Sequence, residues 1–360
     1  MAKESKKHDA KTDGKQPLCT IPGTPVRPLE ANINDRRASL IRISEKKWVN
    51  GTLLHYCFLD EPSTWRGGDD QKDAVRNAFS EWKQLGIGLV FKEVTNPRDA
   101  EIRIGFNQGD GSWSYVGRDN VDYATDPDER TMNFGWDLTT DYGHDTALHE
   151  IGHALGFSHE HQNPKSGIQW DEQEVIDYFA GSPNYWSEEQ TRHNILRKLS
   201  ENETGGSNWD KDSIMHYQFP SGLIIKPEKY QHQPLIPEAG LSPTDIVEAL
   251  RFFPALETNL PELRPWESHR IRIGVGEQID FVIKPKYSRE YTMQTFGKMD
   301  TVMVLFEEIR GENVYYDGDD DSGTSFNAKI TARLVRERSY VLRIRLYYSE
   351  QKGEGALMMW

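Results

Sequence analysis

The sequence predicts an α+β protein in which a mixed twisted sheet with packed helices precedes a small antiparallel β-sandwich. Up to residue 253, stretches with strand-like alternation are interspersed with stretches in which apolar residues recur at helical spacing. Three prolines then fall within residues 254–266, a pattern typical of a linker or domain edge. Beyond them the helical signals fade and alternating strands separated by turns take over. We therefore expect domains at 26–258 and 266–360, joined by a linker at 259–265.

The N-terminal residues 1–25 are expected to form a mobile tail. The opening stretch, MAKESKKHDAKTDGKQP, is basic and polar and has no apolar core, so it cannot bury enough surface to fold alone. It also lacks the apolar region of a signal peptide. The first expectation is therefore a cytoplasmic protein or one exported without a leader. The two cysteines, Cys19 and Cys57, are expected to be free thiols.

Composition sets further limits on partners. The chain has 360 residues, is 36% apolar and carries a formal net charge of −14. An acidic chain is a poor partner for the phosphates of a nucleic acid, and no apolar stretch reaches the roughly 20 residues that span a bilayer. We expect a monomer that has no nucleic-acid partner and does not span a membrane.

The elements of the first domain can be placed in order along the chain. Residues 48–59 have strand character after an Asn-Gly turn signal, and residues 70–86 have helical spacing that ends at a glycine. Residues 87–94, 100–106 and 111–117 are expected to be strands, and residues 144–157 a helix with an apolar stripe. Residues 160–212 are expected to hold short helices and loops. A closing helix is predicted over 242–253, with Ser242 or Thr244 as its cap.

The stretch HEIGHALGFSHEH, residues 149–161, indicates a metal site on the helix over 144–157. His149 and His153 are four residues apart, so both imidazoles lie on one helix face and can bind one ion. Glu150 stands beside them, where a base acting on a water must be. Gly156 lets the chain turn sharply, so that His159 can return as a third ligand. Three protein ligands leave one zinc position open, the catalytic arrangement. His161 breaks the spacing, and His144 falls at the helix start, so neither is expected to be a ligand.

The pattern H-E-x-x-H-x-x-G-x-x-H resembles the metzincin zinc proteases, and HEIGHALGFSHEH is most similar to their astacin branch. The resemblance covers about residues 45–255 and implies a metzincin-type fold. A second family mark is SIMHY at 213–217. The resemblance implies that Met215 forms an apolar floor beneath the ligands. It also implies that Tyr217 binds zinc in the resting enzyme and moves to bind the reaction intermediate.

The resemblance implies further roles in this domain. An edge strand formed by Ser112, Trp113, Ser114, Tyr115 and Val116 would hold an extended substrate by strand addition; the alternative is an ordinary exposed strand. Glu160 would pair with a new N-terminus made by activation cleavage. Cys19 could bind the zinc in a latent form, because thiolates are good zinc ligands, or it could be a free tail cysteine.

The C-terminal segment resembles bacterial pre-peptidase C-terminal domains through stretches such as DGDDDSG and SYVLRIRLYY. Asp317, Asp319 and Asp321 alternate in the way that calcium ligands do. However, the glycine falls one place late for an EF-hand loop. A calcium site and a solvated acidic turn are both consistent with this stretch.

The function expected from these observations is zinc-dependent endopeptidase activity, with zinc held by His149, His153 and His159 and with Glu150 as general base. The substrate would be a protein or peptide. An alternative is an inactive protease scaffold that binds partners through its C-terminal sandwich. The habit of the family favours secretion, as the alternative to the cytoplasmic expectation.

Overall fold

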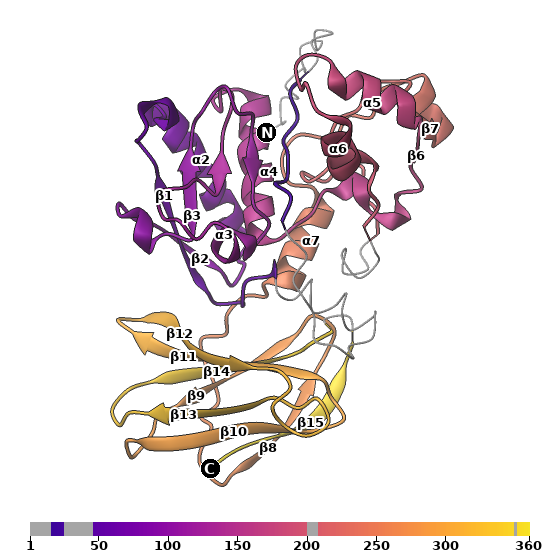
Figure 1. Cartoon of the computed structure of the whole chain (residues 1–360). Coiled ribbons are helices and arrows are strands. Elements are labelled where there is room, and N and C mark those ends of the chain that lie inside the picture. The colour runs from indigo at the N-terminus through magenta and orange to yellow at the C-terminus, as the bar shows by residue number, and fades with distance from the viewer. Residues whose placement is uncertain (1–15, 25–45, 200–207, 349–350) are drawn as a thin grey trace, which may run out of the picture.

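The structure is a computed structural model that describes residues 16–24, 46–199, 208–348 and 351–360, and it has two parts (Figure 1). The strands of the N-terminal domain are β1 (Leu53–Phe58), β2 (Val90–Glu93), β3 (Ile102–Gly105), β4 (Trp113–Ser114), β5 (Met132–Asn133), β6 (Gln169–Trp170) and β7 (Ile224–Lys226). Its helices are α2 (Asp69–Gln84), α3 (Asp119–Asp122), α4 (Asp141–Leu155), α5 (Glu172–Ala180), α6 (Glu188–Thr191), the π-helical η5 (Arg192–Leu196) and α7 (Pro243–Phe252). Short 3₁₀ turns are η1 (Ser63–Trp65), η2 (Pro97–Asp99), η3 (Glu160–Gln162), η4 (Pro164–Ser166) and η6 (Glu228–Gln231).

Five strands of this domain form one mixed sheet, as the sequence predicts, and their order is β2-β1-β3-β5-β4. β1 is parallel to β2 and β3, β3 is parallel to β5, and only β4 is antiparallel to its neighbour β5. β4 lies at the edge of the sheet. The strand expected over 111–117 is shorter than predicted, because β4 spans only Trp113–Ser114.

Helices α2 and α4 pack on this sheet and form the core with it. The apolar positions of α2, including Val75, Phe79 and Trp82, are buried. Trp82 also donates its indole N–H to the carbonyl of Leu148 in α4, at 3.1 Å. α4 is buried along most of its length, because it lies between the sheet and the rest of the domain. This burial fixes the helix that carries the histidine motif.

We call residues 46–156 the sheet half and residues 157–242 the loop half of this domain. The loop half holds α5, α6, η5 and the two-stranded sheet β6-β7 around a second apolar cluster. α7 closes the domain: Ser242 caps it by accepting from the Asp245 N–H, and Asp245 completes the capping box. Ser242 is thus the cap, not Thr244.

The described part of the N-terminal segment, residues 16–24, is packed between these two halves (Figure 1). Leu18 and Cys19 are buried, and Leu18 donates its backbone N–H to Asn184 Oδ1 at 2.9 Å. Ile21 donates its backbone N–H to Asn194 Oδ1 at 2.8 Å. The expectation of a free tail through residue 25 is wrong for residues 16–24, because side chains distant in sequence satisfy their backbone. Residues 1–15 and 25 lie outside the described residues.

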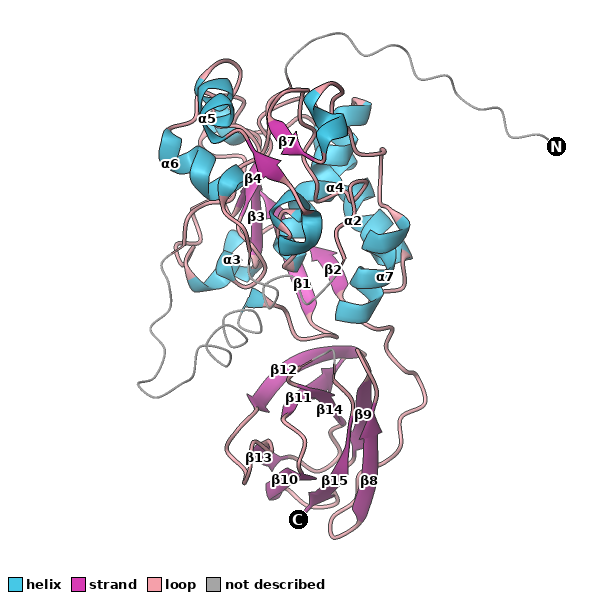
Figure 2. Ribbon diagram, turned by 90° about the vertical axis from the view of Figure 1, so that its right-hand side faces the viewer, coloured by secondary structure: helices cyan, strands magenta, loops and turns pink. Residues whose placement is uncertain are grey.

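The C-terminal part is an antiparallel β-sandwich, as predicted (Figure 2). One sheet has the order β13-β10-β15-β8 and the other β12-β11-β14-β9. The strands are β8 (Ser268–Ile273), β9 (Gln278–Ile283), β10 (Arg289–Gly297), β11 (Thr301–Ile309), β12 (Glu312–Asp319), β13 (Lys329–Leu334), β14 (Tyr340–Leu346) and β15 (Gly353–Met359). Part of the expected linker belongs to this unit, because Leu263 is buried in its core. The resemblance to pre-peptidase C-terminal domains stays a prediction.

The sheet with β11, β12 and β14 faces the N-terminal domain, and a buried ion pair lies at the junction (Figure 1). Arg343 of β14 binds both oxygens of Asp280 on β9, at 2.9 and 2.7 Å, and also donates to the backbone carbonyl of Asn50. Both side chains are about 2–3% exposed. Beside the pair, Val49 packs on an apolar cluster of the sandwich that includes Phe306. The two parts therefore meet through a desolvated contact.

Replacing Arg343 with methionine is expected to destabilise the protein by about 3–5 kcal/mol, because Asp280 would be left buried without a counter-charge. Denaturant unfolding measures this loss. The double variant Arg343→Met/Asp280→Leu should recover most of the stability, since it removes both charges. A single variant that loses less than about 1 kcal/mol would show that the pair is solvated, as exposed pairs are.

No helix among the described residues is long and apolar enough to cross a membrane.

Candidate metal centre

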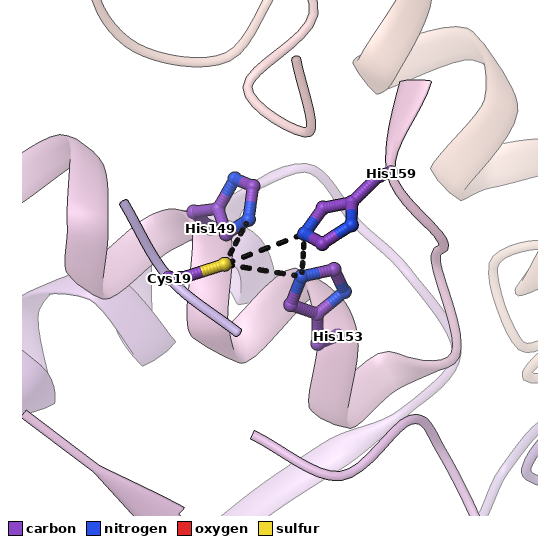
Figure 3. A group of neighbouring side chains, drawn as sticks. All are labelled: Cys19, His149, His153 and His159. Atoms are coloured by element: carbon purple, nitrogen blue, oxygen red, sulfur yellow. Dashed lines mark hydrogen bonds between the residues drawn. The ribbon is translucent and has the colours of Figure 1, made fainter. Parts of the chain in front are cut away.

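Three imidazoles converge at the C-terminal end of α4, and the Cys19 thiol faces them (Figure 3). Cys19 Sγ lies 3.0 Å from His149 Nε2, 3.7 Å from His153 Nε2 and 3.4 Å from His159 Nε2. The Nε2 atoms of His153 and His159 are 3.1 Å apart. All four residues are buried. In the part of the chain that the structure describes, this is the one group of His, Cys, Asp and Glu side chains close enough to hold a metal ion.

The local chain geometry that brings the three histidines together follows from the motif. Thr140 caps α4 by accepting the N–H of Gly143, and the helix ends at Gly156, whose φ is +113°. A residue with a Cβ is strained at that φ, whereas glycine is not. The turn there returns the chain, so that His159 faces the two helix histidines. The structure thus brings together the three ligands that the motif predicts.

The four donor atoms fit a tetrahedral zinc ion. Zinc bonds of about 2.0–2.1 Å to nitrogen and about 2.3 Å to sulfur place tetrahedral donors roughly 3.3–3.6 Å apart. Four of the six separations, from 3.0 to 3.7 Å, lie around that range, and all six are within 4.8 Å. His149 and His153 donate Nδ1–H to the carbonyls of Ile214 and Phe157, both at 2.7 Å. These bonds leave the lone pair of each ring on Nε2, where it can bind a metal. A hydrogen bond from the other ring nitrogen is the usual support of a zinc-binding histidine.

The electrostatics of the site also suit a cation. Burial lowers the pKa of His149 to about 4, and burial also lowers the pKa values of His153 and His159 well below the usual value. Burial, followed by the charge of Glu150, raises the pKa of the Cys19 thiol. Neutral imidazoles are the form that binds metal, and a bound dication deprotonates a coordinating thiol. The donor set therefore fits zinc.

Glu150 is the one carboxylate directly beside this cluster. It is fully buried, and no donor among the described residues forms a well-aligned hydrogen bond to either oxygen, although the Cys19 thiol is close enough to interact with the carboxylate. Burial raises its pKa well above the usual value. A buried carboxylate without a well-aligned donor is costly unless it has a task, and perturbed groups of this kind concentrate at functional sites.

Met215 and Tyr217 line the other side of the cluster. Met215 is buried, and its sulfur packs so closely on Gly152 of α4 that a Cβ there would lie 2.5 Å from it. The Tyr217 hydroxyl is 3.1 Å from Cys19 Sγ and donates to the Cys19 carbonyl at 2.8 Å.

Sequence reasoning missed Asp245 as the residue that holds the turn at 213–217 in place. Asp245 of α7 accepts from the Ile214 N–H at 2.7 Å and from the Ser213 hydroxyl at 2.6 Å. The sequence signals it only as part of a helix cap, and its second role depends on the packing of α7 against residues 213–217.

The histidines outside the ligand set have other partners. His161 donates its Nε2–H to the Asn194 carbonyl at 2.8 Å, and its ring stacks on Tyr217. His144 Nε2 lies 3.2 Å from Glu81 Oε2. Glu160 accepts from the Asn163 amide and the Asp210 N–H, both at 3.0 Å, and burial raises its pKa to about 8.

The predicted edge strand lies beside the cluster and is already paired. Thr20 forms a parallel bridge with Trp113 of β4 and donates its N–H to the Ser112 carbonyl at 3.1 Å. Ser114 and Val116 are buried, and Tyr115 donates its N–H to Thr131 on the sheet side. The outer edge of the sheet at β4 is therefore paired with an extended segment, which here comes from the same chain.

The calcium site considered at Asp317, Asp319 and Asp321 is not supported by the structure. These carboxylates do not form one of the metal-competent groups among the described residues. Asp319 instead accepts from the N–H groups of Ser322 and Lys329, at 3.0 and 2.7 Å. Its oxygens hold the turn after β12, which is what an acidic turn residue does without any ion.

Two zinc-type histidines on a buried helix, a third after the turn that ends this helix, and a methionine turn beneath them define the metzincin class. Residues 41–248 match the family model for Astacin, which describes a family of peptidases. That match covers more than half of the chain, which therefore belongs to the astacin family.

Similar proteins agree with this assignment. The solved structure of myroilysin is 33% identical, covers 59% of this chain and 97% of that one, and superposes with a TM-score of 0.52. Protein SpAN of Strongylocentrotus purpuratus is 29% identical over 153 residues, which are 41% of this chain and 21% of that protein. Karilysin of Tannerella forsythia is 29% identical over 146 residues, 34% of this chain and 28% of that protein. The chain thus spans less than a third of the length of these two curated relatives.

Proposed function

We propose that this chain is a zinc-dependent endopeptidase that hydrolyses peptide bonds in proteins. The observation that carries the proposal is the convergence of three Nε2 atoms beside the buried Glu150 carboxylate. Zinc bound by His149, His153 and His159 would polarise the substrate carbonyl and lower the pKa of a water to about 7.

The protein's own groups supply the remaining chemistry. Glu150 accepts the proton of the attacking water and passes it to the leaving amine, the work of a general acid–base catalyst. The Tyr217 hydroxyl donates a hydrogen bond to the oxyanion that develops on the carbonyl. The edge of β4 holds the substrate chain in an extended form through backbone hydrogen bonds.

We further propose that the described arrangement is a latent form in which Cys19 is the fourth zinc ligand. Three observations support it. The Cys19 sulfur faces the three imidazoles, and residues 18–21 occupy the edge of β4. The Tyr217 hydroxyl donates its hydrogen bond to the Cys19 carbonyl. A substrate needs all three positions, so the segment and a substrate exclude each other.

Cleavage of casein by the full-length protein and by its Cys19→Ala variant tests the function. We expect turnover that a chelator abolishes and that added zinc restores, with one zinc per chain by metal analysis. The competing function is an inactive scaffold that binds through its sandwich. Stoichiometric zinc without turnover in either protein would support that scaffold.

Replacing Tyr217 with phenylalanine in the Cys19→Ala background is expected to lower kcat by about 10²–10³-fold, the usual cost of one oxyanion donor. The zinc content should not change, because the three histidines are intact. Steady-state kinetics and metal analysis on the same sample measure both. A variant with unchanged kcat would show that the hydroxyl serves only to hold Cys19.

A further inference from the structure

A pocket opens beside the metal centre, and three carboxylates are among the side chains that line it. It holds about 100 Å³ and lies between α4, the turn at 213–218 and the loop at 236–238. Its walls include Trp136, Ile214, Ile236 and Pro237. The Glu150 carboxylate lines the same pocket, so a substrate residue next to the cut bond can place its side chain there.

Two further carboxylates line this pocket, one from α4 and one from the loop at 236–238. Asp145 precedes His149 by four residues, so it lies on the same face of α4, about 6 Å along the helix axis. Glu238 is on the facing loop and is exposed. Of the described residues that line the pocket, none is lysine or arginine. The charge of Lys211 also reaches Glu238, but Lys211 is bound to Asp212 at 2.6 Å.

The carboxylate of Asp145 is 28% exposed and has two neighbouring donors. Its Oδ1 accepts the Gly240 N–H at 2.9 Å, and the His144 side chain is the second partner, with Nδ1 3.8 Å from Oδ1. Leu18 of the N-terminal segment also lines the pocket, and its aliphatic side chain brings no charge to meet the carboxylates. Partly buried acidic groups of this kind favour a cationic partner.

We infer that this pocket selects a lysine or arginine side chain of the substrate at a position flanking the cut bond, with Asp145 and Glu238 as the specificity-determining residues. The aliphatic stem of such a side chain packs on the apolar walls while its charged end meets the carboxylates. This inference rests on the proposed peptidase function and names its substrate class.

The test uses zinc-loaded, full-length Cys19→Ala protein and matched fluorogenic peptides. The peptides carry arginine, norleucine or glutamate at each position flanking the bond in turn. We expect kcat/KM for the arginine peptide to exceed that for the norleucine peptide by about tenfold or more at one position, the scale of a charge-assisted hydrogen bond. Asp145→Asn should reduce this ratio to near one, although its Oδ1 can still accept from Gly240. Glu238→Lys should shift the preference toward glutamate.

Asp141→Asn is the matched control. It removes the same charge one turn earlier on α4, at an exposed position that does not line the pocket, and it should leave the ratio unchanged. Cleavage of all peptides without a preference for arginine, or a preference that survives Asp145→Asn, overturns the inference while the peptidase function stands. Failure to cleave any peptide overturns the peptidase function itself.

Discussion

Replacing Glu150 with glutamine in the Cys19→Ala background is expected to lower peptidase turnover by about 10²–10⁴-fold, the contribution of a positioned general base. Glutamine has nearly the same shape but cannot accept the proton of the attacking water. The site should keep its zinc, because Glu150 is not among the converging donor atoms. Single-turnover kinetics and metal analysis measure the two effects separately.

The matched comparison is His153→Ala, which should lose both metal and turnover because it removes a ligand. The two variants together separate binding of the metal from proton transfer. A Glu150→Gln protein with normal turnover would remove the proposed mechanism. A Glu150→Gln protein without zinc would instead make the carboxylate a support of the metal site.

Cys19→Ala is expected to raise the peptidase activity of the full-length protein by at least about tenfold. Without the thiol, only neutral hydrogen bonds would hold residues 16–24 in the site, and each contributes only about 1 kcal/mol. Without the sulfur, residues 16–24 depend on bonds such as those to Asn184 and Asn194. A substrate can then compete for the edge of β4. Initial rates on casein, taken before and after addition of zinc, measure the change.

Cys57→Ala is the control for this effect. Cys57 is the other buried free cysteine and lies in a separate apolar cluster with Leu59 and Ala100. Its replacement should leave the rate unchanged. A Cys19→Ala protein that binds zinc but is no faster than wild type would show that the thiol does not restrain the enzyme.

The sequence predicted those parts of the site that depend on local periodicity. His149 and His153 share a helix face because of the 3.6-residue period, and a glycine was needed where the helix turns back. The predicted helices over 70–86, 144–157 and 242–253 are present as α2, α4 and α7. Of the eight described strands of the sandwich, β11, β13 and β14 correspond to stretches whose strand character was visible in the sequence, and in β13 and β14 this character is a clear alternation.

Local signals failed where one short pattern allows two outcomes. The alternating aspartates of DGDDDSG suit calcium and a tight turn equally, and the hydrogen bonds of Asp319 decide for the turn. Similarly, residues 16–24 are too short and too polar to predict as ordered structure. Their order comes from Asn184, Asn194 and Ser112, which are more than 90 residues away in the chain.

By itself, then, the sequence determined the candidate metal ligands and the candidate base, because they depend on spacing along one helix and the turn that follows it. It also determined the order of the two domains, because helical periodicity gives way to strand alternation along the chain. Only the tertiary structure decided that Cys19 faces the histidines, that Asp245 holds the turn beneath them, and that Asp145 and Glu238 share a pocket. These relations join residues from separate elements, and the packing of α4 between the sheet and the loop half sets the distances between them. No periodicity in the chain records such distances.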